Sequence, residues 1–185
     1  MKRILFLASA LLLISANTFA APPGDQPSTT EAFVEKSIEV KEVYTSQIGV
    51  RELTGKNDGV QVQAYLKTVG LGKGYAWCAA FVKWCFLQVG IKTPTNGMAA
   101  SFHNPKRLVY FKSRFLHDPQ PGDVFTLYYP HLKRIGHTGF YDGRLNKSIY
   151  YTVEGNTNGA GSREGDGVYR KYRSFKATHS ISRWL

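Results

Sequence analysis

The chain has 185 residues, of which 43% are hydrophobic and 14% are aromatic, so it carries enough apolar side chains for one hydrophobic core. This composition excludes a disordered or collagen-like chain, and two cysteines are too few for a disulfide-rich scaffold. The formal net charge of +11 points to a polyanionic partner or surface, but charge alone does not distinguish nucleic acid, lipid and cell wall.

The first twenty residues have the layout of a secretory signal peptide. Lys2 and Arg3 precede an apolar run over residues 4–14, and small residues close the segment at Ala20. This run is short against the roughly 20 residues of a membrane span, and no stop-transfer pattern follows it. Residues 1–20 therefore predict an exported protein, secreted or periplasmic, with no stable membrane anchor after cleavage. Cleavage would reduce the net charge to +9.

Residues 21–30 are rich in Pro, Ser and Thr and predict a flexible leader before a single domain over 31–185. A first helix is expected to be capped by Thr29 or Thr30 and to end near Gln47. Its expected apolar face consists of Val34, Ile38, Val43 and Ile48.

Two more helices precede a region of strands. A short helix is expected from Asp58 or Gly59 to Thr68, and a third from Cys78 to Gly90. Runs of β-branched and aromatic residues then predict five strands, at about 123–129, 137–142, 148–155, 167–174 and 179–184. Helices followed by strands indicate an α+β domain, with N-terminal helices packed on one face of an antiparallel sheet of about five strands.

The two cysteines lie seven residues apart within the third predicted helix. A rise of 1.5 Å per residue places their Cα atoms about 10 Å apart, beyond the roughly 7 Å that a disulfide spans. Cys78 and Cys85 are therefore expected to stay unpaired, and without a second pair at metal spacing they make a poor zinc site. Cys78 opens the helix, where the partial positive charge of a helix N-terminus favours a thiolate. Cys85, between Trp84 and Phe86, is expected to be a core residue.

A reactive thiol needs a base, and His137 is the candidate among five histidines. It stands at the start of a predicted strand between Gly136 and the nearby Gly139, whose small size lets another group approach the imidazole. The other histidines lie in loop-like contexts or at the last strand and are expected to be solvated or structural: His103, His117, His131 and His179.

A third group must orient the imidazole. The strand of His137 and the next strand form a predicted hairpin, and a turn centred between Leu145 and Asn146 sets His137 directly opposite Glu154. Asn156 shares the face of Glu154 and would support or replace it, whereas a register slip of one residue would turn both away.

Four segments together resemble the CHAP family, the cysteine, histidine-dependent amidohydrolases/peptidases of the papain-like and NlpC-like superfamily. The resemblance covers about Ile48 to Leu185. It is carried by YAWCAAFVKWCF around Cys78, PGDVF at 121–125, GHTGFY at 136–141 and VEGNTN at 153–158.

The resemblance implies a papain-like fold and hydrolysis of amide bonds in peptidoglycan, either between muramic acid and the first alanine or within the stem peptide. It implies Cys78 as nucleophile, His137 as base, Glu154 as the orienting group and Asn156 as an accessory catalytic residue. Tyr75 and Trp77 precede the nucleophile and are expected either to bind substrate or to pack in the core. No metal or cofactor is expected, because no acidic cluster like the calcium loop of some members accompanies the helix.

Three rival readings remain open. The domain could be a wall-binding module that has lost activity, although each expected catalytic position is filled. A nucleic-acid binder would fit the basic charge, but export argues against it. A secreted lytic toxin would use the same chemistry against competitors and would be accompanied by an immunity protein. The favoured expectation is a monomeric enzyme that acts on peptidoglycan and binds no nucleic acid.

Overall fold

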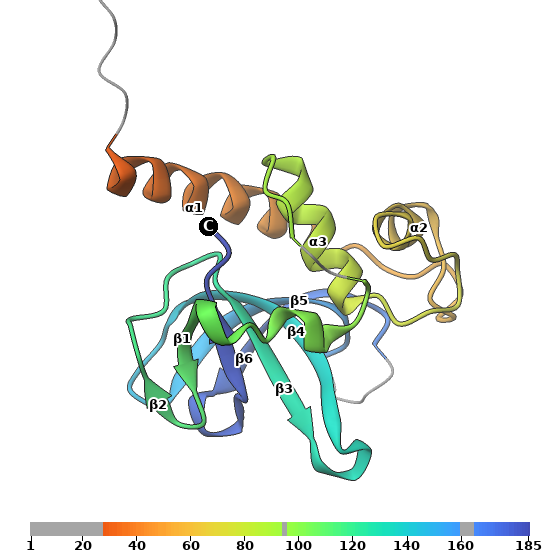
Figure 1. Cartoon of the computed structure of the whole chain (residues 1–185). Helices are drawn as coiled ribbons and strands as arrows, with labels where there is room; N and C mark the ends of the chain where they lie inside the picture. Colours follow the sequence, from red (N-terminus) through yellow and green to blue (C-terminus); the bar gives the residue numbers. More distant parts are fainter. Residues whose placement is uncertain (1–27, 94–95, 160–164) are drawn as a thin grey trace, which may run out of the picture.

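The computed structural model describes residues 28–93, 96–159 and 165–185, and the predicted signal peptide lies outside this part of the chain. The domain has an α+β fold, in which helices lie over one face of an antiparallel sheet (Figure 1). The helices are α1 (Thr29–Ser46), α2 (Val60–Lys67) and α3 (Cys78–Gln88). None of the helices in the described ranges is long and apolar enough to cross a membrane.

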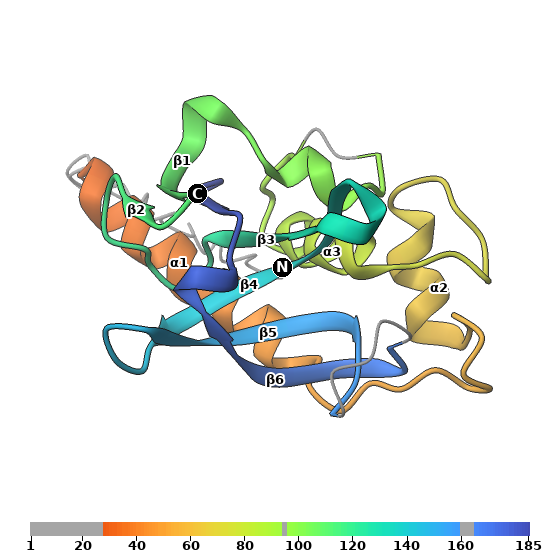
Figure 2. The ribbon, with the colours of Figure 1, turned by 90° about the horizontal axis from the view of Figure 1, so that it is seen from below.

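The sheet has seven strands in the order β2-β1-β7-β3-β4-β5-β6, and all neighbours are antiparallel. The long strands lie side by side when the sheet is seen from below (Figure 2). The strands are β1 (Leu108–Phe111), β2 (Arg114–Phe115), β3 (Val124–Tyr129), β4 (Arg134–Arg144), β5 (Ile149–Thr157), β6 (Gly167–Ser174) and β7 (Ser180–Ser182).

The prediction of about five strands is corrected to seven. The five predicted strands correspond to β3 to β7, whereas β1 and β2 were missed. These two strands have four and two residues, which is too short for an alternating pattern to show in the sequence. Short 3₁₀ helices connect several elements: η1 (Ala99–Phe102), η2 (Pro105–Arg107), η3 (Pro130–Leu132) and η4 (Phe175–Ala177).

Helix α1 begins with a capping box at Ser28, one residue before the predicted cap. The Ser28 hydroxyl accepts from the Glu31 backbone N–H at 3.2 Å, and the Ser28 N–H donates to the Glu31 carboxylate at 2.8 Å. The Glu31 pKa is lowered by these bonds with Ser28.

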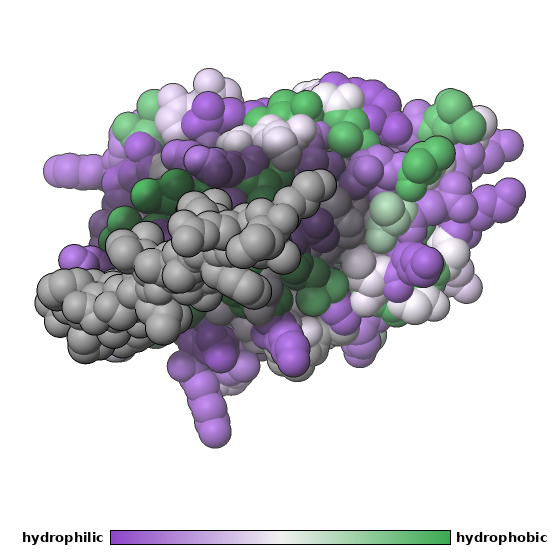
Figure 3. Space-filling model, turned by 90° about the horizontal axis from the view of Figure 1, so that it is seen from above, coloured by the Kyte–Doolittle hydropathy of each residue, from purple (hydrophilic) through white to green (hydrophobic). Residues whose placement is uncertain are grey.

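The predicted apolar face of α1 is wrong except at Val43, which packs against the core. Val34 and Ile38 are 50% and 53% exposed, whereas Val40 and Tyr44 are fully buried. At 3.6 residues per turn, the exposed pair and the buried pair lie about a third of a turn apart around the helix. The contacts of Tyr44 decide which side is buried. Its ring stacks on Phe140 at 4.6 Å, and its hydroxyl donates to Asp142 at 2.7 Å. The visible surface on the helix side is mostly hydrophilic, with separate hydrophobic patches (Figure 3).

Helix α3 is the central element of the core. Its buried side chains include Phe81, Cys85 and Phe86, and it packs against both other helices and the sheet. Phe140 of β4 contacts Phe81 and Phe86 with ring centroids 6.0 and 5.3 Å apart. These edge-to-face contacts fix α3 against β4, the two elements that carry the predicted nucleophile and base.

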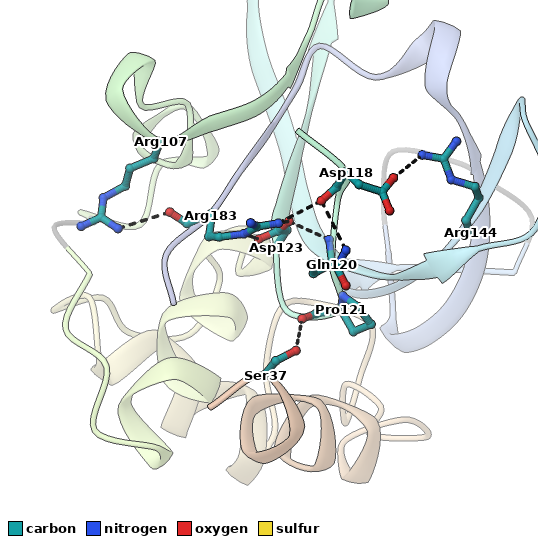
Figure 4. Close-up of polar contacts among 8 residues, drawn as sticks. All are labelled: Ser37, Arg107, Asp118, Gln120, Pro121, Asp123, Arg144 and Arg183. Atoms are coloured by element: carbon teal, nitrogen blue, oxygen red, sulfur yellow. Dashed lines mark hydrogen bonds and ion pairs between the residues drawn. The ribbon is translucent and has the colours of Figure 1, made fainter. Parts of the chain in front are cut away.

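The turn that leads into β3 is tied to both ends of the domain (Figure 4). Asp123 is fully buried and accepts from Arg183 at 2.9 and 2.8 Å, while Ser37 of α1 donates to the Pro121 carbonyl at 2.6 Å. Burial raises the pKa of Asp123, although the bonds from Arg183 oppose this shift. Gly122 is required here, because it has a φ of +94° and an added Cβ would lie 2.8 Å from Val40. The turn therefore joins α1, β3 and the chain's last residues.

Candidate active site

Cys78 is the first residue of α3 and is almost buried, with 7% of its surface exposed. At this position it meets the unsatisfied N–H groups and partial positive charge of the helix N-terminus. Cys85 is fully buried, and burial raises the pKa of its thiol well above the ordinary value. Both cysteines are free, as expected from their spacing along the helix.

His137 lies in β4 with 6% of its surface exposed and is bonded on both sides. Its Nε2 lies 2.8 Å from a carboxylate oxygen of Glu154, and its ring also bonds to the Cys78 side chain. Because Glu154 occupies Nε2, Nδ1 is the nitrogen that remains for the sulfur. Burial lowers the pKa of His137, but the bonds and charges of Cys78 and Glu154 outweigh it and raise the pKa to about 9.

The contact between His137 and Glu154 is present, but the predicted strand register is wrong. Phe140 pairs with Val153 and Tyr141 with Thr152, so Gly139, and not His137, lies opposite Glu154. This shift of two residues keeps both side chains on the predicted face, because side chains alternate with a period of two. A bulge between Tyr141 and Gly143 separates this part of the pairing from the turn.

Gly139 makes room for the Glu154 side chain. A Cβ added at Gly139 would lie 3.0 Å from Cγ of Glu154 and 2.9 Å from the Val153 carbonyl oxygen. The carboxylate can therefore cross over residue 139 and reach His137 diagonally.

Glu154 is fully buried and accepts four hydrogen bonds. One oxygen accepts from Thr152 at 2.6 Å and from Arg173 Nε at 2.7 Å, and the other bonds to His137 and to Arg173 Nη2 at 2.5 Å. Burial raises the pKa of Glu154, but the bonds and charges of His137 and Arg173 overcome it and lower the pKa to about 2. The carboxylate is therefore held ionised.

The sequence prediction missed Arg173, which comes from β6. The segment VYRKYRS alternates as a strand with one buried and one solvated face does, so its arginines carry no specific signal in the sequence. The register of β5 and β6, in which Tyr150 pairs with Arg173, is what brings the guanidinium beside the carboxylate.

Asn156 lies in the site but does not take the place of Glu154. Its carbonyl oxygen accepts from the Trp77 backbone N–H at 2.9 Å, and its amide nitrogen donates to Asn57 at 3.1 Å and to the Gly165 carbonyl at 3.3 Å. Asn156 has a φ of +55°, in the left-handed region that Asn tolerates better than most residues. Glu154 is therefore the residue that bonds to His137, and Asn156 holds the residue that precedes Cys78.

Cys78 and His137 open into a cleft of about 140 Å³. Its walls come from the segment before α3, from η1 and from the β3–β4 hairpin, through Ala76, Gly97, Met98, Ala99, Tyr129, Leu132, Arg134, Gly136 and Asn156. The hairpin needs Gly136, because a Cβ there would lie 2.4 Å from the Tyr129 ring. The sequence prediction did not identify this hairpin or η1 as cleft walls.

The two predicted substrate-binding aromatics lie elsewhere. Trp77 is fully buried, its indole nitrogen donates to Glu52 at 2.8 Å, and its ring stacks on Tyr65 at 5.5 Å. Trp77 is thus a core residue, the alternative that the sequence left open. Tyr75 is 57% exposed and is not among the cleft-lining residues. Within the described residues, no group of three or more His, Cys, Asp or Glu side chains is arranged to hold a metal ion.

An almost buried cysteine at a helix start, bonded to a histidine that a carboxylate orients, is the arrangement of a cysteine hydrolase. Residues 70–156 match the family model of the CHAP domain and include all four predicted catalytic residues. Over these residues the chain is similar to this family of cysteine, histidine-dependent amidohydrolases/peptidases.

One similar solved structure is a mutated form of the resuscitation promoting factor interacting protein RipA. The two chains are 18% identical with a TM-score of 0.47, and the match covers 82% of this chain and 62% of that chain. No curated protein sequence matches this chain.

Proposed function

We propose that this protein is a cysteine hydrolase that cleaves amide bonds in bacterial peptidoglycan, as an N-acetylmuramoyl-L-alanine amidase or a stem-peptide endopeptidase. The observation that carries the proposal is the chain of contacts from Cys78 through His137 to Glu154. The CHAP family match over residues 70–156 supports the same class of reaction.

The first half of the reaction forms a thioester. With a pKa of about 9, His137 is an imidazolium at neutral pH and lies beside the sulfur of Cys78, which attacks in its thiolate form. The sulfur attacks the amide carbonyl carbon, and the resulting oxyanion accepts from the Cys78 backbone N–H at the helix start. His137 then protonates the leaving amine as the carbon–nitrogen bond breaks.

The second half releases the acid. The neutral imidazole of His137 removes a proton from water, which attacks the thioester carbonyl. The carbon–sulfur bond breaks, the carboxylic acid leaves, and the thiolate–imidazolium pair is restored. Glu154 stays ionised throughout and holds the ring in place through Nε2.

The proposed setting is outside the cytoplasm, in the periplasm or in secreted form, with the protein acting as a monomer. The predicted signal peptide and the net charge, +9 after cleavage, support this setting, because bacterial cell wall is anionic. The same chemistry would serve wall remodelling or attack on competitors, and an immunity protein would accompany the second use.

The test is mass spectrometry of fragments that wild-type protein releases from purified peptidoglycan. We expect soluble fragments, and the newly freed amine identifies the bond that is cut. Cys78→Ala should release none, while Cys85→Ala, which changes only a core thiol, should retain turnover. Wild-type protein that sediments with the wall and releases nothing would refute hydrolysis and identify a binding module.

A further inference from the structure

We propose that Arg173 is a positioning residue of this site, which fixes the plane of the Glu154 carboxylate for His137 and sets the pH range over which the Cys78–His137 pair works. The proposal deepens the function proposed above and rests on it only for its activity measurement.

The first argument is the geometry around the carboxylate. Each oxygen of Glu154 accepts two hydrogen bonds, and Arg173 supplies one to each, at 2.7 and 2.5 Å. A two-pronged guanidinium fixes the plane of a carboxylate, which single donors cannot do. Without Arg173, one bond from Thr152 and one from His137 would remain, and the carboxylate could rotate.

The second argument is that Arg173 is committed to this contact. Its side chain is only 24% exposed, and all of its side-chain hydrogen bonds within the described residues go to Glu154. An arginine on a solvated strand face would leave most of its guanidinium to water. Burying this cation is costly, and the buried carboxylate compensates for it.

The third argument is electrostatic. Arg173 places a positive charge beside Glu154, and this charge opposes a second positive charge on His137. The other titratable groups around the network are Cys78 of α3, Tyr129 of β3, Tyr150 of β5 and Lys171 of β6. Because these groups are unchanged in an Arg173 variant, the lost cation accounts for any shift. Removal of Arg173 is therefore expected to keep His137 protonated to higher pH.

Arg170 provides a matched control on the same strand. It forms an ion pair at 2.7 Å with Asp142, whose side chain is buried, away from the cleft lining. Arg170→Met and Arg173→Met thus each remove an arginine of β6 from a buried carboxylate. Only the second change touches Glu154.

The experiment measures the His137 titration by NMR of its ring Cε1–H, assigned with His137→Ala, together with kcat and KM on peptidoglycan. In Arg173→Met we expect the midpoint to rise by about 0.5–1 pH unit and kcat to fall tenfold or more, with KM within about twofold. Arg170→Met should leave both measurements at the wild-type values. Arg173→Lys keeps the positive charge but cannot donate to both carboxylate oxygens as a guanidinium does. Its titration midpoint should therefore equal that of the wild type, while its kcat should stay low.

A wild-type midpoint and kcat in folded Arg173→Met would overturn the proposal, as would an equal shift in Arg170→Met. If Arg173→Met does not fold, Arg173→Lys is the test. A wild-type kcat in that variant would show that the two hydrogen bonds from the guanidinium to Glu154 are not needed. The NMR titration uses no substrate, so it tests the role of Arg173 even if wild-type protein cuts no peptidoglycan.

Discussion

Replacing Asn156 tests how the start of α3 is held beside the catalytic pair. The Asn156 side chain accepts the Trp77 N–H at 2.9 Å and donates to Asn57 and the Gly165 carbonyl. In Asn156→Ala the N–H of buried Trp77 loses this acceptor, and a residue with a Cβ must keep a φ of +55°. We therefore expect both lower stability and a displaced Cys78.

The magnitude follows from two costs. A buried donor left without its partner costs about 1–3 kcal/mol, and the left-handed conformation costs alanine about 1–2 kcal/mol. Asn156→Ala should therefore lower the free energy of unfolding by about 2–5 kcal/mol. Asn156→Gly loses the same hydrogen bonds but has no strained Cβ, so it should lose about 1 kcal/mol less.

Urea unfolding of the wild-type protein and both variants measures these differences, and turnover of peptidoglycan measures the effect on the site. We expect both variants to lose activity to a similar extent, because each releases the residue before Cys78. If Asn156→Ala unfolds at the wild-type urea midpoint while turnover is lost, the reasoning is refuted. Asn156 would then act on the substrate or on His137.

Three further outcomes are expected. Glu154→Gln should lower kcat less than His137→Ala, because it disturbs the orientation of the base and leaves the base in place; an equal loss in steady-state kinetics would show a larger role for Glu154. Arg134 is a cationic residue of the cleft lining, so Arg134→Gln should raise KM more for peptides with a carboxylate than for matched carboxamides, while Lys133→Asn, outside the cleft lining, should not. Because the pKa of His137 is raised, its protonation stabilises the folded state fully below the ordinary pKa of histidine, and this stabilisation is lost as the pH rises through about 9. Between about pH 6 and pH 10, the wild-type protein should therefore lose more free energy of unfolding than His137→Ala. Equal losses would contradict this pKa.

Features encoded in short stretches of sequence could be predicted. Helix α2 and strands β3 to β6 lie close to their predicted ranges, because glycines and alternating side chains mark them locally. Cys78 could be identified because a helix start is visible in sequence, and Glu154 because alternation alone decides which face it shares with His137. A register error of two residues left that face unchanged.

Features that depend on packing between distant segments could not be predicted. The buried face of α1 is the one on which Tyr44 contacts Phe140 and Asp142, about one hundred residues later in the sequence. It is not the most apolar side of the helix. Arg173 required the register of β5 and β6, and the cleft walls required the placement of η1 and the β3–β4 hairpin. None of these long-range contacts produces a periodic pattern in the local sequence.

Two glycines show how the fold brings the site together around Glu154. Gly139, opposite Glu154, clears the path that the carboxylate takes to His137. Gly155, the next residue of β5, faces the opposite side, where an added Cβ would lie 2.7 Å from Phe81 and from the Trp77 ring. The first glycine lets the Glu154 carboxylate reach His137, and the second lets the sheet approach the helix that carries Cys78. The arrangement of Cys78, His137 and Glu154 thus depends on two positions that have no side chain.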